Sequence, residues 1–112
     1  FYMQPNGAFM LLGSGDSIIR TTREIALGMA QFRRQVRLAT QSGPILVRDG
    51  VINESFRPGS PNRRIRSGVG IDGRRRVVFV LSEAPVTFHE LASMFNRSLG
   101  CADALYLDGE IS

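Results

Sequence analysis

The feature that most restricts the fold is a pair of Asp-Gly steps, Asp49-Gly50 and Asp72-Gly73, each lying between short apolar runs. Asp-Gly is a strong signal for a two-residue hairpin turn, because both turn positions need positive φ. The steps predict two β-hairpins, which join residues 44–48 to 51–52 and residues 67–71 to 76–82. A chain built on two such hairpins is expected to contain an antiparallel sheet.

Three more strands are predicted from apolar runs. Residues 8–12 and 17–19 flank a Gly- and Ser-rich turn and predict a hairpin near the N-terminus. Residues 104–107 predict a strand near the C-terminus. The run at residues 77–81 is apolar at every position, which predicts a central strand covered on both faces.

Two helices are predicted from capping boxes, in which a Thr side chain and a Glu side chain three residues later satisfy each other's backbone N–H groups. Thr21 with Glu24 begins the first helix, and Thr87 with Glu90 begins the second. Their apolar faces are expected to consist of Ile25, Met29, Phe32 and Val36 in the first, and of Phe88, Leu91, Ala92, Phe95 and Leu99 in the second. Gly100 is the expected stop of the second helix.

These elements predict an α+β fold, with a mixed, mainly antiparallel sheet and at least two packed helices. The 112 residues suffice for one domain with a modest core. Because Phe1 falls inside a predicted strand and Ser112 follows directly on a motif, we expect residues 1–112 to be a fragment of a larger domain. No apolar run is long enough to span a bilayer.

The charge pattern is compatible with an anionic ligand. The net charge is +4, and the basic side chains are all arginine, which makes bidentate contacts with phosphates and carboxylates. Compositional bias of the genome is the alternative explanation. The pI near 10.5 also suits a nucleic-acid binder, but aromatic residues do not interleave with the dispersed arginines, so no nucleic acid is expected as a partner.

Three motifs carry candidate site residues. In the first, Gln41 and Ser42 offer hydrogen bonds to an anion or a hydroxyl, and Gly43 lets a ligand approach the backbone. In the second, strand alternation places Arg64 and Arg66 on one face, where they could clamp a phosphate. The alternatives are a plain turn for the first motif and a solvated edge strand for the second.

The third motif is Asp108-Gly109 at the end of a predicted strand. A carboxylate there could orient a sugar hydroxyl, act as a base or bind a cation, and a simple turn is the alternative. Three other features are expected to be structural: residues 74–76 as a solvated hairpin tip, His89 as an exposed surface residue, and Cys101 as a small buried apolar residue. The single cysteine excludes a Cys-based zinc site, and neither a metal nor a cofactor is expected.

Taken in order, the motifs resemble the C-terminal half of the phosphodiester glycosidase family. The resemblance covers roughly residues 39–112 and includes ATQSGPILV at 39–47, RSGVGID at 66–72, the helix at 88–95 and LGCADALYLDG at 99–109. Each motif is short, but their order and spacing together are specific. The residues after Asp108-Gly109 are Glu110-Ile111-Ser112, as in the uncharacterised bacterial branch, where the uncovering-enzyme branch has a run of glycines and then serine.

What this resemblance implies is hydrolysis of a sugar joined through its anomeric oxygen to a phosphodiester. Asp108 and Arg66 would be the catalytic residues. The substrate-binding residues would be Gln41, Ser42, Gly43, Arg64, Gly109 and Ser112. The partner would be a sugar phosphodiester or phosphorylated glycan, and family members suggest an extracytoplasmic location, periplasmic or secreted. The alternative is a carbohydrate- or phosphate-binding module that has the same fold and no catalytic activity.

Overall fold

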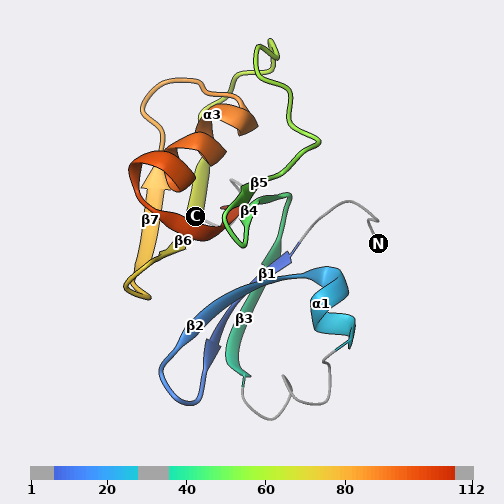
Figure 1. Cartoon of the computed structure of the whole chain (residues 1–112), viewed down its shortest axis with the longest axis vertical. Coiled ribbons are helices and arrows are strands. Elements are labelled where there is room, and N and C mark those ends of the chain that lie inside the picture. Colours follow the sequence, from blue (N-terminus) through green and yellow to red (C-terminus); the bar gives the residue numbers. More distant parts are fainter. Residues whose placement is uncertain (1–6, 28–35, 108–112) are drawn as a thin grey trace.

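The computed structural model describes residues 7–27 and 36–107. Its N-terminal part is a three-stranded antiparallel sheet of β1 (Gly7–Leu12), β2 (Ser17–Thr21) and β3 (Val36–Ser42), in the order β2-β1-β3 (Figure 1). The turn between β1 and β2 is closed by the Gly15 amide, which donates to the Leu12 carbonyl at 3.0 Å, with Gly15 at φ 95°. The N-terminal hairpin predicted from the turn residues is therefore confirmed.

The first helix, α1 (Thr22–Leu27), begins at the predicted capping box. The Thr21 amide donates to Glu24 Oε1 at 2.8 Å, and the Glu24 amide donates to Thr21 Oγ1 at 3.1 Å. The predicted apolar helical face is wrong at Val36, which belongs to β3 and pairs with Leu12. Met29 and Phe32 lie outside the described residues.

The larger sheet has five antiparallel strands in the order β5-β4-β8-β6-β7. The strands are β4 (Ile45–Arg48), β5 (Val51–Ile52), β6 (Ser67–Asp72), β7 (Val77–Leu81) and β8 (Cys101–Leu107). Every strand pair in the described part of the chain is antiparallel. The α+β class and the mainly antiparallel arrangement are confirmed.

The two Asp-Gly steps form different turns. Asp49 and Gly50 have φ of 53° and 82°, so both central positions of the β4–β5 hairpin have positive φ as predicted. In the β6–β7 hairpin the positive φ falls on Arg75, at 63°, and the loop extends over residues 73–75. The Asp72 carboxylate accepts from the amides of Arg74 and Arg76, both at 2.9 Å, which supports this longer loop. The predicted two-residue turn at this hairpin is therefore wrong.

The prediction that residues 77–81 form a central strand is also wrong. β7 lies at the edge of the sheet, and the side chains of Phe79 and Leu81 are 68% and 71% exposed. The central position belongs to β8, which comes last in the sequence and inserts between β4 and β6. This insertion joins strands far apart in the chain, so a local apolar run cannot reveal it.

One face of the larger sheet is covered by α3 (Phe88–Ser93), which continues as the π-helix η1 (Met94–Ser98) (Figure 1). The predicted capping box of Thr87 and Glu90 is present, and Gly100 ends the helix at φ 68°. The Phe95 ring packs on the two glycines of β6: a Cβ added at Gly68 or Gly70 would lie 2.8 Å from this ring. Glycine at these positions therefore serves helix packing. None of the helices within the described ranges combines the length and apolar character needed to cross a bilayer.

The opposite face of the larger sheet packs on the smaller one. Ile19 of β2 is fully buried in a cluster with Ile45, Val69, Ile71 and Leu105, which come from β4, β6 and β8. Cys101 is fully buried in the cluster under α3, as predicted. The predicted solvated tip at residues 74–76 is confirmed, since all of these side chains are exposed.

An ion-pair network also connects α1 to the larger sheet. Arg48 of β4 donates to both carboxylate oxygens of Glu24, at 2.8 and 2.6 Å, and to Asp103 Oδ1 at 2.8 Å. The hydrogen bonds from Arg48 lower the pKa of Glu24 from its ordinary value of 4.5 to about 2. Because the folded-state pKa is depressed, the stabilisation is complete above the unfolded pKa and is lost as pH falls from 4.5 toward about 2.

We expect Glu24→Gln to destabilise the chain by about 1–2 kcal/mol near pH 7, a value reduced for the partial exposure of the pair. Glutamine keeps an acceptor for the Thr21 amide, so the change reports the loss of the carboxylate charge, which Arg48 stabilises most. Urea unfolding near pH 7 and near pH 3 measures it, and the loss should shrink at the lower pH. The matched control is Glu83→Gln, at an exposed glutamate with no ion-pair partner in the described ranges. An equal loss at both pH values would contradict the electrostatic origin.

Candidate functional site

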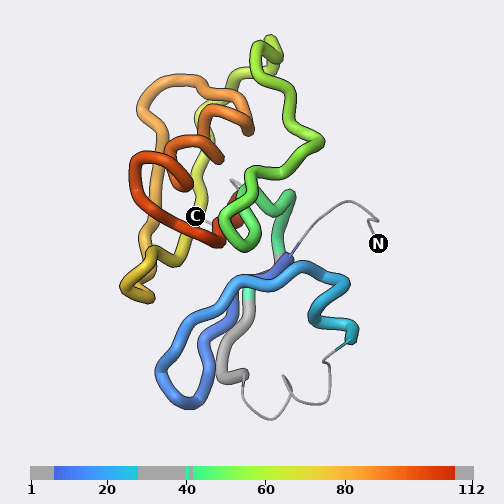
Figure 2. The backbone as a smooth tube through the Cα atoms, in the orientation of Figure 1, coloured from blue at the N-terminus to red at the C-terminus, as the bar shows by residue number. Residues whose placement is uncertain are grey.

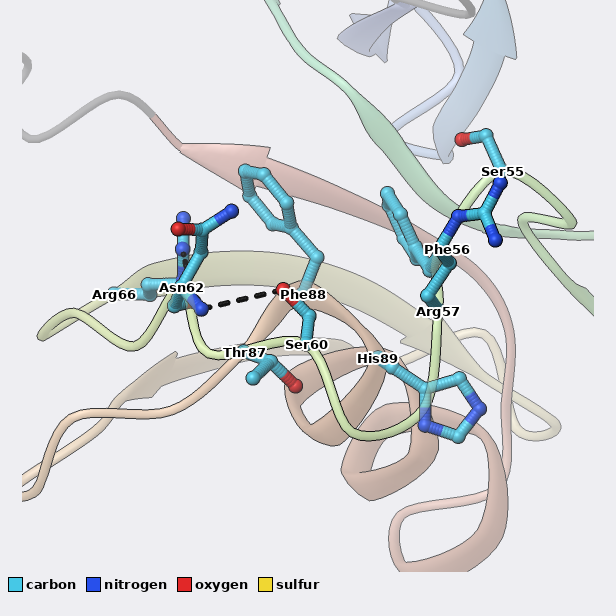
Figure 3. Close-up of a pocket in the computed structure, with 9 residues that line it drawn as sticks. All are labelled: Ser55, Phe56, Arg57, Ser60, Asn62, Arg66, Thr87, Phe88 and His89. Carbon is cyan, nitrogen blue, oxygen red and sulfur yellow. Dashed lines mark hydrogen bonds between the residues drawn. The ribbon is translucent and has the colours of Figure 1, made fainter.

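A pocket of about 270 Å³ lies between the loop at residues 55–62 and the start of α3. Figure 2 shows this loop, in green, running beside the orange turn at which α3 begins. The lining combines aromatic, hydroxyl, amide and basic side chains (Figure 3): Ser55, Phe56, Arg57, Ser60, Asn62, Arg66, Thr87, Phe88 and His89. No carboxylate is among these lining residues, so the described wall of the pocket suits an anionic or neutral polar ligand better than a cation.

Arg66 is the most constrained polar residue of this pocket. Its side chain and backbone are 6% exposed, and its guanidinium donates from Nε to the Val86 carbonyl at 2.8 Å and from Nη2 to the Asn62 carbonyl at 3.1 Å. Its backbone is held by Ser82, whose hydroxyl accepts from the Arg66 amide at 2.8 Å. The guanidinium is thus held in one orientation, with Nη1 lacking an acceptor among the residues that the structure describes.

Aromatic rings complete the support of Arg66. Its Cζ lies 3.9 Å from the centroid of the Phe88 ring and 5.7 Å from that of Tyr106, in range of cation–π attraction. Phe88 stacks on Phe56 with centroids 5.2 Å apart and meets Tyr106 edge-on at 5.0 Å. The three rings form a wall that keeps the arginine charge in place and limits its hydration.

Strand pairing brings the described parts of the three sequence motifs to one end of the larger sheet. The Tyr106 amide donates to the Pro44 carbonyl at 3.1 Å, and Ser67, which follows Arg66, pairs with Leu107. The Gly43-Pro44 peptide is cis and leads from β3 into β4. The motif around Ser42, the motif around Arg66 and the last described residue before Asp108 therefore lie at the same end of this sheet.

Of the site residues predicted from the sequence, one lines the pocket, some lie away from it, and others are outside the described residues. Ser42 is half-buried at the end of β3, and neither it nor Gly43 is among the residues that line the pocket. Arg64 is exposed, forms a backbone bridge with Val86 and does not line the pocket, whereas Arg66 does. The side chain of Gln41, and all of Asp108, Gly109 and Ser112, lie outside the described part of the structure.

Several lining residues were not predicted from the sequence. His89, expected on the surface, is half-buried and lines the pocket, and Phe88, expected in the apolar stripe, packs against Arg66. Phe56, Arg57 and Asn62 come from a Pro- and Gly-rich segment that is typical of a plain loop. The only local signal was an aromatic residue, Phe56, within a polar loop. Within the described ranges, no three His, Cys, Asp or Glu side chains are grouped so that they could hold a metal ion.

Comparison with known proteins agrees with the motif order. The sequence matches the family described as phosphodiester glycosidase over residues 3–112. It is 35% identical over 112 residues to the uncharacterized protein YigE of Escherichia coli (strain K12), an alignment that covers 100% of this chain and 42% of that protein. The chain thus spans less than half the length of this relative. The family match extends over nearly the whole sequence, and the chain belongs to the phosphodiester glycosidase family.

Proposed function

We propose that the full-length protein hydrolyses a sugar-1-phosphodiester. In this reaction the oxygen of water joins the anomeric carbon, the bond from that carbon to the phosphate oxygen breaks, and a phosphomonoester leaves. The products are the free sugar and the phosphomonoester, and the proton from water goes to the leaving phosphate or to solvent. The observation that carries the proposal is Arg66, a residue that is 6% exposed, whose guanidinium is held by two carbonyls and which lines a pocket with no carboxylate among its described lining residues.

A guanidinium fixed in this way suits the departing phosphate. Negative charge accumulates on the phosphate oxygens as the sugar–oxygen bond breaks, and a donor already in position stabilises that charge without reorganising. Partial exclusion of water by Phe88 and Tyr106 strengthens the attraction. Arg66 would accordingly bind the phosphodiester in the ground state and stabilise it more strongly in the transition state.

The remaining roles rest on the family resemblance. Asp108 would orient the sugar or activate the attacking water, and Gly109 would leave the backbone open beside it. Ser42, Gly43, Gln41, Arg64 and Ser112 would contact the sugar or the phosphate. The resemblance also supports an extracytoplasmic site of action, periplasmic or secreted.

The test is turnover by the full-length protein on a panel of glycosyl phosphodiesters with a nitrophenyl or methyl aglycone. We expect free sugar and phosphomonoester to appear in equal amounts, measured by reducing-end assay and by phosphorus NMR. Hydrolysis in oxygen-18 water should label the sugar and leave the phosphomonoester unlabelled. Label in the phosphate would show attack at phosphorus and would overturn the proposed reaction.

A binding module without catalysis is the second candidate, and one observation favours it. The described lining of the pocket has basic and neutral groups but no carboxylate that could act as general acid or base. On this reading the protein binds glycosyl phosphodiesters and releases them unchanged. Calorimetric titration of the same panel, run beside the activity assay, separates the two: heat of binding without product over hours favours the module.

A further inference from the structure

Resting on the proposed function, a narrower inference concerns the sugar. The pocket volume of about 270 Å³ is at the lower limit of small-molecule sites, which range over about 300–1,000 Å³. It therefore holds one part of a glycosyl phosphodiester, with the rest outside. Aromatic, amide and hydroxyl groups line it together, a composition that suits a sugar ring, because Phe56 and Phe88 offer apolar faces and Asn62 offers an amide.

Basic side chains occur at both ends of this pocket. Figure 3 shows Arg66 and Asn62 at one end and Arg57 and His89 at the other, with the Phe88 and Phe56 side chains between them. The ring contacts support this order, since Phe88 touches the Arg66 guanidinium and stacks on Phe56, the residue before Arg57. A ligand whose phosphodiester contacts Arg66 would extend along the rings toward Arg57 and His89.

No ion pair within residues 7–27 and 36–107 neutralises the Arg57 charge at the far end. Arg57 has no ionic or hydrogen-bonding side-chain partner in the described ranges, whereas the nearby Arg63 donates to both oxygens of Glu90, at 2.8 and 2.9 Å. His89 offers a ring N–H donor whichever form it takes. Since no carboxylate is among the described lining residues, the far end attracts an acceptor that carries negative charge.

We propose that the pocket selects sugars with an acidic substituent remote from the anomeric carbon, and that Arg57 and His89 bind this substituent. The phosphodiester at the anomeric carbon contacts Arg66, the ring lies along Phe88 and Phe56, and the acidic group reaches Arg57 and His89. A carboxylate and a phosphate share the required chemistry. Arg57 and His89 would thus determine specificity, whereas Arg66 acts on the scissile group.

The experiment compares three methyl phosphodiesters that differ only at carbon 6: hexosyl, uronosyl with a carboxylate, and 6-phosphohexosyl with a phosphate. For the full-length protein we expect at least one acidic substrate to have a KM about tenfold below the neutral one, as one charge-assisted hydrogen bond would produce. Arg57→Gln and His89→Leu should each reduce the ratio of the neutral substrate's KM to the acidic substrate's KM several-fold. The control Arg74→Gln, at the exposed hairpin tip, should leave the ratio as in wild type.

Calorimetry with the same three compounds makes the outcome independent of catalysis. Tighter binding of an acidic compound supports the inference even if no compound is hydrolysed, in which case only the proposed reaction fails. If both acidic compounds bind as tightly as the neutral one or more weakly, the inference about the sugar is wrong. Turnover of the neutral compound would still support the proposed reaction in that case. If Arg57→Gln and His89→Leu both still bind an acidic compound more tightly than the neutral one, other residues recognise the acidic group, and the inference is again wrong. The two acidic compounds distinguish a carboxylate ligand from a phosphate ligand.

Discussion

Replacing Arg66 with alanine is expected to lower kcat/KM of the full-length protein on a glycosyl phosphodiester about 10²–10³-fold, as removal of a preorganised oxyanion donor does. The guanidinium is held by Val86 and Asn62 carbonyls and by the Phe88 ring, so no other described group can take its position. Asp108→Asn should give a comparable loss if this carboxylate activates water or orients the sugar. Steady-state kinetics of both variants measure the effect.

Folding must be separated from chemistry for this variant. Alanine removes the Arg66 donor from the Asn62 carbonyl and leaves the Val86 carbonyl with the Arg64 amide alone, which costs about 1–3 kcal/mol of stability, so melting is measured alongside turnover. Arg66→Lys keeps the charge and loses the planar fork, and we expect it to recover only a small part of the activity. The control Arg74→Ala removes an exposed arginine and should retain wild-type kcat/KM. A folded Arg66→Ala protein with undiminished activity would remove Arg66 from the reaction.

Replacing Phe95 with alanine is expected to destabilise the chain by about 3–5 kcal/mol, the largest effect we predict on folding. The Phe95 side chain is fully buried, and its ring occupies the space that Gly68 and Gly70 leave on β6. Truncation removes the side chain that joins η1 to the sheet and leaves a cavity that two glycines cannot fill. Urea unfolding followed by far-UV circular dichroism measures the loss.

A double-mutant cycle with Gly68→Ala tests whether the contact itself is responsible. On its own Gly68→Ala should cost about 1–3 kcal/mol, because the new methyl group would lie 2.8 Å from the Phe95 ring. In the Phe95→Ala background the methyl group enters the cavity, so the two losses should not add. Phe79→Ala, at a 68% exposed phenylalanine on β7, is the matched control with little expected cost. Additive losses would contradict the packing of ring against glycine.

Sequence patterns predicted the structure correctly where it depends on residues that are close together in the chain. The two capping boxes, the helix stop at Gly100 and the Asp49-Gly50 turn depend on hydrogen bonds and φ values within a few residues, and all four occur as predicted. The second hairpin shows the limit of such signals. Its loop extends over residues 73–75, and the Asp72 carboxylate accepts from the amides of Arg74 and Arg76, an arrangement that the Asp-Gly pattern does not predict.

For the candidate site, the sequence indicated the residues of the motifs but not their surroundings. Arg66 was selected by its place before a strand, and the structure places it in a pocket. The Phe88 ring beneath it comes from a helix, and Phe56 comes from a loop. Residues so far apart in the chain come into contact only after folding, and neither apolar periodicity nor turn composition predicts such contacts.

The sequence alone therefore determined the helix starts, the hairpins, the α+β class and the family, since these follow from short-range patterns and from motif order. It did not predict β3, whose first residue, Val36, was assigned to a helix. Only the tertiary structure decided that β8 lies between β4 and β6, that β7 is left at the edge with Phe79 and Leu81 exposed, and that Arg66 packs on Phe88. The physical reason is that strand order and side-chain contacts are set by long-range burial. Many pairings satisfy the same local hydrogen bonds, and the competition among them is resolved by the packing of the whole core.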